Sequence, residues 1–563
     1  TTGYDFLNAV NGIFVDGRHR RAFDRLYAQF TGRDVNFREL ANGTKKMIML
    51  VSFASEVNLL AHALDRISSS HRWYRDFTRN SLVFALREII ACLPVYRTYE
   101  TAPGAPAADR DRRYVGAAVA EAKRRNPRTA ESLFDFVRDT LLFDNINTFR
   151  PEDRPGVVSF VLSFQQLTGP VMAKGVEDTA FYVYNRLVSL NEVGGNPSRF
   201  GTPLAAFHRA NVATCRRWPH TLTASSTHDT KRSEDVRARI NALSEMPVEW
   251  RAAVARWSAL NRALKTDVDG QPAPDANDEY LLYQTLVGAW PLRGPQGGFV
   301  DRIVQYMRKA TKEAKVHTSW VNANEGYDRA VEGFVRSALG DGLQTECARD
   351  IGAFAATVAP YGALNSLSAL VLKIAAPGVP DTYQGTDLYD FSLVDPDNRR
   401  PVDYDERQRL LLELDKRGQD SLPALIGDLT GDIEQPAAKL FVLSRALRFR
   451  SQNIDLFRRG DYVPLFATGS RGTHVVGFAR RHGRAWAIAA APRLVRGIAA
   501  SAAGPIAAEV WGNAALRLPR GAPDAWVDAF TGADVTSSRE RGPRALYARD
   551  LFARFPLALL RPA

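Results

Sequence analysis

The stretch of sequence that decides the fold is residues 225–235, S-S-T-H-D-T-K-R-S-E-D. Small and β-branched residues fill positions 221–227 and predict a buried strand. Ser233 is placed to cap the helix that follows. His228 and Asp229 lie between the two, just beyond the end of the strand. On this dipeptide alone, a helix-capping loop with Asp229 near a helix N-terminus is the simpler interpretation.

Two other segments show the same order of strand, loop and helix. Residues 157–164 (V-V-S-F-V-L-S-F) are followed by the loop T-G-P-V-M-A-K-G and an apolar-periodic run. Residues 369–375 are a buried-strand candidate and precede P-G-V-P-D-T-Y-Q-G-T-D-L. Units of this kind predict a parallel sheet, and long helical insertions between them are acceptable in a (β/α)8 barrel, whose loops carry function.

The length and composition indicate a globular protein of several domains. The chain has 563 residues, well beyond the roughly 250–300 at which single cores stop growing. Apolar residues make up 45% and charged residues 24%, which excludes a disordered, collagen-like or coiled-coil chain. No run approaches the roughly 18 uncharged apolar residues of a membrane span, because the longest candidate, residues 364–380, contains Lys373. We therefore expect a soluble protein with no membrane partner.

The net charge, the cysteines and the histidines bear on the partners, location and cofactors of the protein. The 74 basic residues exceed the 62 acidic ones, giving a net charge of +12 that would suit a nucleic-acid binder if it were clustered. The arginines are interleaved with acids, so a solvated surface is the simpler interpretation and we expect no nucleic-acid partner. Three separated cysteines without a C-x-x-C pair suit a cytoplasmic protein. Without H-E-x-x-H or other ligand spacing, we expect no metal or other cofactor.

Polar side chains also follow the other two predicted strands. Lys174, Glu177 and Asp178 crowd a loop beside three aromatic residues, a composition that suits carbohydrate binding, although a surface ion pair on an amphipathic helix explains it equally well. The loop after residues 369–375 offers Tyr383 and Gln384 among several acids. Because Asp and Asn near Pro make turns, most of those acids should be structural.

Distinctive blocks occur in a fixed order along nearly the whole chain. They are T-T-G-Y-D-F-L-N, L-P-V-Y-R-T-Y, Q-Q-L-T-G-P-V-M-A-K-G-V-E-D-T-A, S-T-H-D-T-K-R-S-E-D-V-R-A-R, P-G-V-P-D-T-Y-Q-G-T-D-L, V-D-P-D-N-R-R-P-V-D-Y and W-x-D-x-F-T-G. By these blocks the sequence resembles the maltooligosyltrehalose synthases, a glycoside hydrolase family 13 group related to the α-amylases. It departs from the pattern at Thr382 and Asp387, where an aromatic residue and Glu are expected.

The resemblance implies a fold class and an order of domains. The expected fold is α/β: the C-terminal part of a (β/α)8 barrel, holding its last three strands, with large helical insertions and a C-terminal all-β domain. The expected segments are barrel residues 1–29, a helical insertion at 30–155, barrel residues 156–240 with strands 6 and 7, a second helical insertion at 241–350, barrel residues 351–420 with strand 8, a helical connection at 421–463 and a β-sandwich at 464–563. Within the last, alternating runs at 474–480 and 485–491 around R-H-G-R predict a hairpin.

The resemblance also implies a reaction, an intramolecular transglucosylation. The reducing-end α-1,4 bond of a maltooligosaccharide becomes an α,α-1,1 bond by the retaining mechanism. Asp229 matches the catalytic carboxylate that grips the 2- and 3-hydroxyls of the distorted sugar, and His228 its hydroxyl-binding neighbour. Lys174 and Glu177 are candidates for the pocket that confines the cleaved glucose, with Tyr383 and Gln384 as further substrate-binding residues. A functional link to a maltooligosyltrehalose trehalohydrolase is also implied.

Two catalytic carboxylates of the family are not found in the sequence. The α-amylase relatives carry the nucleophile in a G-x-R-x-D block and the general acid Glu one strand later, both before the T-G-Y-D-F-L-N block. This sequence has no G-x-R-x-D block, and no carboxylate precedes Asp5. We therefore expect this sequence to be the C-terminal two-thirds of the enzyme and to be inactive by itself.

Alternative functions remain open at this point. Within the family, a 4-α-glucanotransferase or amylase differs from a trehalose-forming enzyme by keeping a reducing end on its products. A non-catalytic glucan-binding remnant would retain glucan without turnover. A nucleic-acid binder has only the net charge in its favour.

Overall fold

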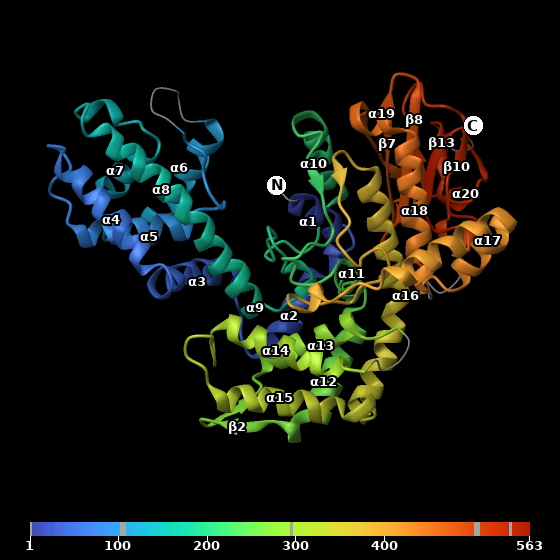
Figure 1. Cartoon of the computed structure of the whole chain (residues 1–563), viewed down its shortest axis with the longest axis horizontal. Helices are drawn as coiled ribbons and strands as arrows, with labels where there is room; N and C mark the ends of the chain where they lie inside the picture. The colour runs from blue at the N-terminus through green and yellow to red at the C-terminus, as the bar shows by residue number, and fades with distance from the viewer. Residues whose placement is uncertain (1–2, 102–107, 293–296, 500–506, 540–542) are drawn as a thin grey trace. The chain divides into compact units, whose positions relative to one another are not determined.

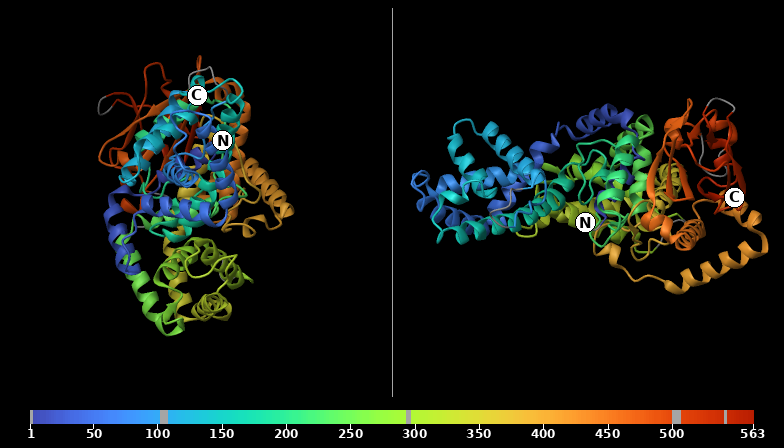
Figure 2. Two further views of the ribbon diagram at one scale, coloured as in Figure 1. Left: turned by 90° about the vertical axis from the view of Figure 1, so that its left-hand side faces the viewer. Right: turned by 90° about the horizontal axis from the view of Figure 1, so that it is seen from above.

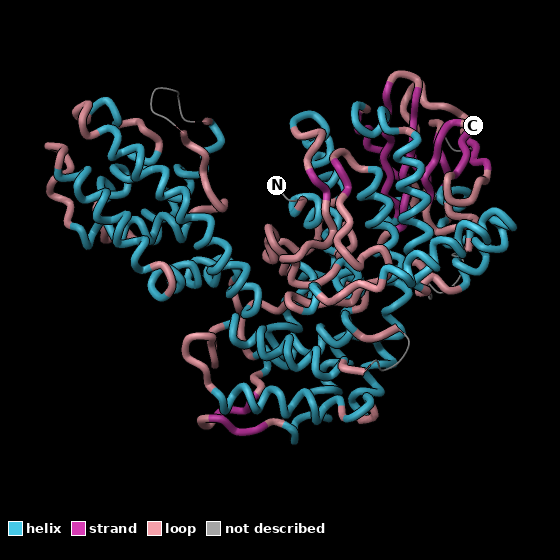
Figure 3. Tube along the Cα trace, viewed as in Figure 1, coloured by secondary structure: helices cyan, strands magenta, loops and turns pink. Residues whose placement is uncertain are grey.

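The computed structural model describes residues 3–101, 108–292, 297–499, 507–539 and 543–563. The chain forms two compact units. The first unit comprises Thr1–Arg33, Asn185–Ala310 and Asn322–Ala563, and the second comprises Asp34–Tyr184 and Thr311–Val321. Most of the chain is helical, and the longer strands gather in the C-terminal region (Figure 3).

The second unit is a helical bundle, which includes most of residues 30–155 and continues to Tyr184. Its elements are α3 (Phe37–Val51), α4 (Ala54–Ser69), α5 (Arg79–Cys92), α6 (Asp109–Arg125), α7 (Glu131–Leu141), α8 (Arg154–Met172), the π-helix η3 (Ala173–Ala180) and α9 (Phe181–Val183) (Figure 1). In α4 the predicted apolar positions, among them Val57, Leu60 and Leu64, are buried. One continuous apolar core joins α3 to α8, so burial of amphipathic faces stabilises these helices.

The strand predicted at residues 157–164 is wrong, because this segment is part of helix α8. Its buried residues include Val157, Phe160, Val161 and Phe164, which lie three or four positions apart on one helical face. The β-branched and aromatic composition favoured a strand, but the helical spacing of the apolar residues and the packing of α8 against α4 outweigh that preference.

The first unit contains a short parallel sheet of two strands. β1 (Leu222–Thr223) pairs with β4 (Val379–Pro380), with Leu222 opposite Val379. β1 lies within the predicted strand, whereas residues 369–375 belong to helix α16 (Glu346–Ala375) and β4 comes after it. Of the three predicted strands, only the one at residues 221–227 contains an observed strand in the described part of the chain. The strand predicted at residues 369–375 is wrong, because a fully buried helix is as apolar as a buried strand.

The helices around this sheet are mostly long. They are α1 (Tyr4–Gly12), α2 (Arg20–Thr31), α10 (Leu204–Arg217), α11 (Glu234–Leu243), α12 (Pro247–Asn261), α13 (Ala276–Ala289), α14 (Phe299–Ala314), α15 (Glu325–Leu339), α16, α17 (Tyr404–Gly431), α18 (Pro436–Gln452) and α19 (Ile454–Arg459). The described residues 241–292 and 297–350 are mostly helical, apart from loops and the hairpin β2 (Thr266–Val268) and β3 (Gln271–Ala273). α11 packs along α16, and Gly3 at the start of α1 lies so close to β1 that an added Cβ would stand 2.4 Å from the Ala224 amide nitrogen.

Within the described ranges, two helical segments are long and apolar enough to cross a membrane by length and composition alone. They are Arg154–Val183 and Glu346–Ala375, with mean hydropathy 1.2 and 1.3, and the bent pair α3 and α4 would add a third span if it counted as one. The expectation of no membrane span was based on uncharged apolar runs alone, so it did not identify these two segments. In the second segment 78% of the most apolar window is buried inside the protein, against 44% in the first, so the protein itself covers most of the apolar surface of α16.

The C-terminal region is built from antiparallel strands. These strands are drawn in orange to red in Figure 2. A six-stranded sheet has the order β11 (Asp534–Thr536), β10 (Ala525–Asp528), β13 (Ala558–Pro562), β8 (Ala485–Pro492), β7 (Val475–His482) and β5 (Asp461–Leu465). A three-stranded sheet joins β12 (Ala545–Tyr547), β9 (Ala515–Arg517) and β6 (Ala467–Thr468). The predicted hairpin is confirmed as β7 and β8, with Gly483 at a φ of 59° in the two-residue turn. Leu516 packs over Gly477, so the two sheets face each other at this point.

Candidate active site

His228 and Asp229, which we call the candidate pair, lie in the loop between β1 and α11, as the sequence predicts. Thr230 Oγ1 donates to the Thr227 carbonyl (2.8 Å), and the Asp229 amide donates to Thr227 Oγ1 (3.1 Å), so the loop is a compact turn. The Tyr4 and Thr227 hydroxyls are 3.0 Å apart and tie α1 to this turn. The His228 and Asp229 side chains are 60% and 58% exposed, with Nε2 3.4 Å from Oδ2. A ligand in solvent can therefore meet an imidazole and a carboxylate side by side.

The loop is anchored by Glu192, which sequence reasoning did not single out. Its side chain is fully buried. The carboxylate accepts hydrogen bonds from the backbone amides of Lys231 (2.8 Å) and Arg232 (3.3 Å), and the Arg237 guanidinium of α11 lies 3.2 Å away. One buried carboxylate thus fixes the chain directly after the candidate pair, and its charge is balanced by Arg237.

We expect Glu192→Gln to lower the free energy of unfolding by about 1–3 kcal/mol, because an amide replaces one acceptor oxygen with a donor that faces buried N–H groups. Urea denaturation followed by circular dichroism measures the change. Glu249→Gln is the matched control, since that side chain is 52% exposed and should change stability little. Equal stability of the two variants would contradict the anchoring role of Glu192.

Tyr383 is connected to the candidate pair through the backbone and side chain of Asn398. The Tyr383 hydroxyl donates to the Asn398 carbonyl (3.1 Å), and Asn398 Nδ2 donates to the His228 carbonyl (3.2 Å). Gln384 follows Tyr383 with an exposed side chain. The structure therefore brings the P-G-V-P-D-T-Y-Q-G-T-D-L block to the same region as S-T-H-D, as expected, although the roles of Tyr383 and Gln384 toward a substrate stay a prediction.

Three acids in this segment make ion pairs with the protein, which supports the expectation that most of them are structural. The pairs are Asp397 with Arg302 (2.8 Å), Asp395 with Lys309 (2.8 Å) and Asp387 with Arg407. Two of the three basic partners lie on α14, so these pairs pin the loop after β4 to the helical region.

A buried lysine cluster begins one residue after Ser233 and was not foreseen either. Lys439 of α18 has a fully buried side chain, and its Nζ lies 2.7 Å from Glu234 Oε1 and 2.7 Å from Asp235 Oδ2. Lys373 of α16 donates to the Ser225 hydroxyl (2.8 Å). Burial alone would raise the pKa of Glu234, but the charges of Lys439 and Lys373 outweigh it and hold that pKa at about 2. Both carboxylates of this cluster are thus committed to contacts within the protein.

The predicted position of Ser233 at the start of α11 is confirmed, but the predicted capping by its side chain is wrong. Ser233 occupies the N-cap position of α11, but its hydroxyl donates to the Asp390 carbonyl instead of accepting from the helix. The Ser226 hydroxyl accepts from the Glu234 amide (2.9 Å) in its place. The helix start is therefore satisfied by a serine from the loop between β1 and α11.

Lys174 and Glu177 lie in the second unit, whereas the candidate pair lies in the first. Lys174 Nζ is 2.7 Å from Asp178 Oδ2, and the Lys174 side chain is 58% exposed. Glu177 is buried, and its carboxylate accepts a hydrogen bond from the Tyr96 hydroxyl. The M-A-K-G-V-E-D and L-P-V-Y-R-T-Y blocks are thus in contact, while the proposed acceptor pocket stays a prediction.

Lys45 joins these two blocks from α3. Its Nζ donates to the Leu93 carbonyl (2.9 Å), and burial lowers its pKa to about 8. A Cβ added to Gly175 would lie 2.9 Å from the Lys45 Cα. This close approach explains why a glycine stands at that position in M-A-K-G.

Comparisons with known proteins agree with the arrangement of these blocks. No family model matches the sequence. A curated protein of Mycobacterium tuberculosis (strain ATCC 25618 / H37Rv), which bears the name of a maltooligosyl trehalose synthase, is 38% identical over 397 residues, 70% of this chain and 45% of that protein. The structure of maltooligosyltrehalose synthase from Arthrobacter ramosus matches all of this chain and 63% of its own, with 33% identity and a TM-score of 0.79. A further maltooligosyl trehalose synthase structure is 28% identical to this chain, with a TM-score of 0.70. The match covers all of this chain and 62% of the other.

This chain is a homologue of the maltooligosyltrehalose synthases. It spans less than two thirds of the length of the relatives that it matches. The recognition made from the sequence blocks is therefore confirmed.

The W-x-D-x-F-T-G block of this synthase homologue has a structural role. Trp526 and Phe530 are fully buried in the C-terminal region. Asp528 accepts hydrogen bonds from the Thr531 hydroxyl (2.7 Å) and the Leu559 amide (3.0 Å), which joins β10 to β13. The block therefore builds the core of the C-terminal sheet.

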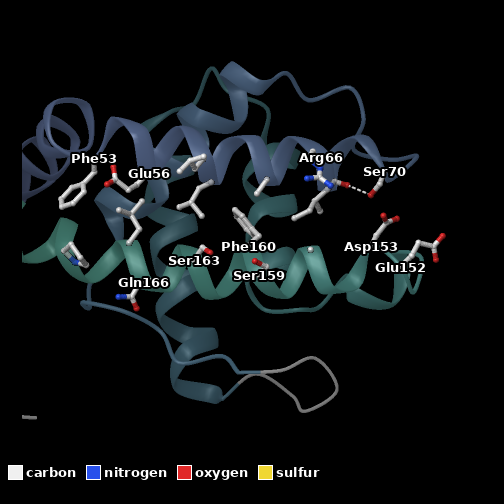
Figure 4. A pocket seen from close by; sticks show the side chains of 17 residues that line it. Phe53, Glu56, Arg66, Ser70, Glu152, Asp153, Ser159, Phe160, Ser163 and Gln166 are labelled. Atoms are coloured by element: carbon white, nitrogen blue, oxygen red, sulfur yellow. Dashed lines mark hydrogen bonds between the residues drawn. The ribbon is translucent and has the colours of Figure 1, made fainter.

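A groove lies between α4 and α8 in the second unit (Figure 4). It has a volume of about 750 Å³. Its apolar lining includes Leu60, Phe160 and Leu167, and its polar lining includes Glu56 and Gln166. None of the six site residues predicted from the sequence lines this groove. Among the described residues, no group of three or more His, Cys, Asp or Glu side chains is placed to hold a metal ion.

Proposed function

We propose that this chain contributes the candidate pair to an enzyme that converts the reducing-end α-1,4 bond of maltooligosaccharides into an α,α-1,1 bond. The observation that carries the proposal is the exposed pair His228 and Asp229, side by side at the end of parallel strand β1 in a homologue of maltooligosyltrehalose synthases. β1 and β4 are then strands of a (β/α)8 barrel of the glycoside hydrolase family 13 type, with the candidate pair at the catalytic end.

In this mechanism Asp229 accepts hydrogen bonds from the 2- and 3-hydroxyls of the sugar that is being cleaved, and His228 binds a neighbouring hydroxyl. The Asp229 carboxylate stabilises the positive charge of the oxocarbenium-like transition state. The cleaved glucose turns and attacks through its anomeric hydroxyl before water does. That order of events requires a closed acceptor site, for which Lys174 and Glu177 are the candidates.

We propose further that the chain is inactive by itself. The retaining mechanism needs two carboxyl groups about 5–5.5 Å apart beside the scissile bond. Three acids near the candidate pair do not suit these roles, because Glu192 is buried on backbone amides and Glu234 and Asp235 are bound to Lys439. The nucleophile and the general acid would then come from a polypeptide segment outside this sequence.

The decisive experiment uses the reducing end of the product. In a hybrid synthase, this chain replaces the matching 63% of the Arthrobacter ramosus enzyme. We expect the hybrid to convert maltopentaose into a non-reducing pentasaccharide, and the 563-residue chain alone to convert none. New reducing ends would favour the amylase or 4-α-glucanotransferase alternative. A folded hybrid that binds maltopentaose but converts none would favour the glucan-binding alternative.

The cellular location and the functional partner of the enzyme are also proposals. Cys92, Cys215 and Cys347 are free thiols, which supports a reducing cytoplasm as the location. The trehalosyl end of the product is a substrate for a hydrolase that cleaves next to it, so a maltooligosyltrehalose trehalohydrolase is the proposed functional partner.

We expect Lys174→Ala in the hybrid synthase to raise the ratio of hydrolysis to trehalosyl product several-fold, because a leaking acceptor site lets water reach the intermediate. Free glucose and non-reducing product are measured together by chromatography. Lys123→Ala is the matched control, since Lys123 makes comparable ion pairs with Glu131 and Asp135 in the same unit. An unchanged ratio for Lys174→Ala would assign Lys174 to a structural ion pair only.

A further inference from the structure

Trp320 stands on the surface of the second unit in a fixed orientation. Its side chain is 58% exposed. The indole Nε1 donates to Glu313 Oε1 (3.0 Å), and the Lys312 ammonium lies 5.1 Å from the ring centroid. A hydrogen bond at its edge and a cation against its ring restrain the indole, so it offers an ordered apolar surface to solvent.

A chain of polar contacts connects this indole to Lys174. Glu313 also contacts Lys315, with Oε2 3.3 Å from Nζ. Lys315 donates to the Asp178 carbonyl (3.0 Å), and the Asp178 carboxylate holds Lys174 at 2.7 Å. Segment Thr311–Val321 is therefore fastened to π-helix η3, which carries Lys174 and Asp178, and the exposed indole and the exposed ammonium belong to one connected structure.

We infer that Trp320, together with Lys174 and Asp178, forms a binding surface for a glucosyl unit of an α-1,4-glucan. A pyranose ring has an apolar face of C–H groups and an edge of hydroxyls. An indole covers the apolar face, while an ammonium and a carboxylate bind the hydroxyls as donor and acceptor. This inference rests on the proposed function for its choice of sugar, and it adds an aromatic stacking residue to the surface of Lys174.

Exposure alone does not lead to this assignment, as Trp73 shows. Trp73 is 74% exposed in the same unit, and the Arg72 guanidinium lies 5.2 Å from its ring centroid. It stands in the connection between α4 and α5 and not in the segment fastened to η3. Trp73 therefore supplies a control with the same side chain, the same kind of cation contact and a different location.

The test measures binding of maltohexaose to the 563-residue chain by isothermal titration calorimetry. We expect Trp320→Ala to weaken binding about tenfold or more, which corresponds to about 1.4 kcal/mol or more. Trp320→Phe should retain most of the affinity because it keeps an aromatic face. Trp73→Ala should bind as the unchanged chain does, and circular dichroism checks that all variants are folded.

Two outcomes would overturn the inference. One is unchanged affinity in Trp320→Ala, and the other is an equal loss in Trp320→Ala and Trp73→Ala. Failure of the proposed function gives a different result, because the hybrid synthase would then make no non-reducing product whatever residue stands at position 320. If the chain without substitutions does not bind maltohexaose, the inferred glucan-binding surface is refuted directly.

Discussion

Asp229→Asn in the hybrid synthase is expected to lower kcat for maltopentaose by about 10³-fold or more while the melting temperature stays the same. An amide carries no negative charge, so it cannot stabilise the positive charge of the transition state, and loss of one such electrostatic contact costs about 10²–10³ in rate even for a neutral donor. Stability should not change, because the Asp229 side chain is 58% exposed. Non-reducing product from maltopentaose is the quantity to measure.

Two further variants separate catalysis from binding at this site. Asp420→Asn, an exposed acid on α17, serves as the control and should leave kcat unchanged. His228→Ala removes a hydroxyl-binding group, so we expect a higher KM with a smaller effect on kcat than Asp229→Asn has. Near-normal turnover of Asp229→Asn would refute its role as a catalytic carboxylate.

The parts of the structure that the sequence predicts depend on local patterns. The helical spacing of Val57, Leu60 and Leu64 predicts α4, and the alternation around Gly483 predicts the hairpin of β7 and β8. The strand-loop-helix order around His228 also has a local origin. Each of these features is determined by residues within about ten positions of one another, so one sequence is enough to find it.

The error at residues 369–375 arises because burial removes the local pattern, whereas at residues 157–164 the β-branched and aromatic composition favoured a strand over the helical spacing of the apolar residues. Residues 157–164 and 369–375 are apolar enough for a buried strand, and both are helical. In α16 nearly every side chain in the C-terminal half is covered, so no polar face marks the helical period. Length was the remaining signal, because α8 and α16 extend over 19 and 30 residues, far beyond an ordinary strand.

The supporting residues of the site were missed because their partners are distant in sequence. Glu192 meets Lys231 across 39 positions, and Lys439 meets Asp235 across 204. Neither residue belongs to a motif with a recognisable spacing. One available signal was a lysine within an apolar stretch, as at Lys373 and Lys439, because a buried ammonium requires acidic partners.

The second large effect is expected at Lys439, where replacement by Met should lower the free energy of unfolding at pH 7 by about 3–5 kcal/mol. The Lys439 side chain is fully buried between Glu234 and Asp235, and its removal leaves two buried carboxylates without their cation. Burial alone would lower the pKa of Lys439, but these carboxylates raise it above its usual value. Urea denaturation of Lys439→Met, with the exposed Lys416→Met as control, measures the loss.

The pH dependence identifies the cause of that loss. In the unchanged chain the pKa of Glu234 is about 2 when folded and 4.5 when unfolded, so its contribution is complete above pH 4.5 and disappears as the pH falls through 2. In Lys439→Met burial is no longer opposed by the Lys439 charge, so the carboxylates become costly to ionise and stability should fall as the pH rises above 4.5. The difference between the two proteins should therefore widen from pH 3 to pH 7. A constant difference over that range would attribute the loss to side-chain packing and exclude the buried charges as its source.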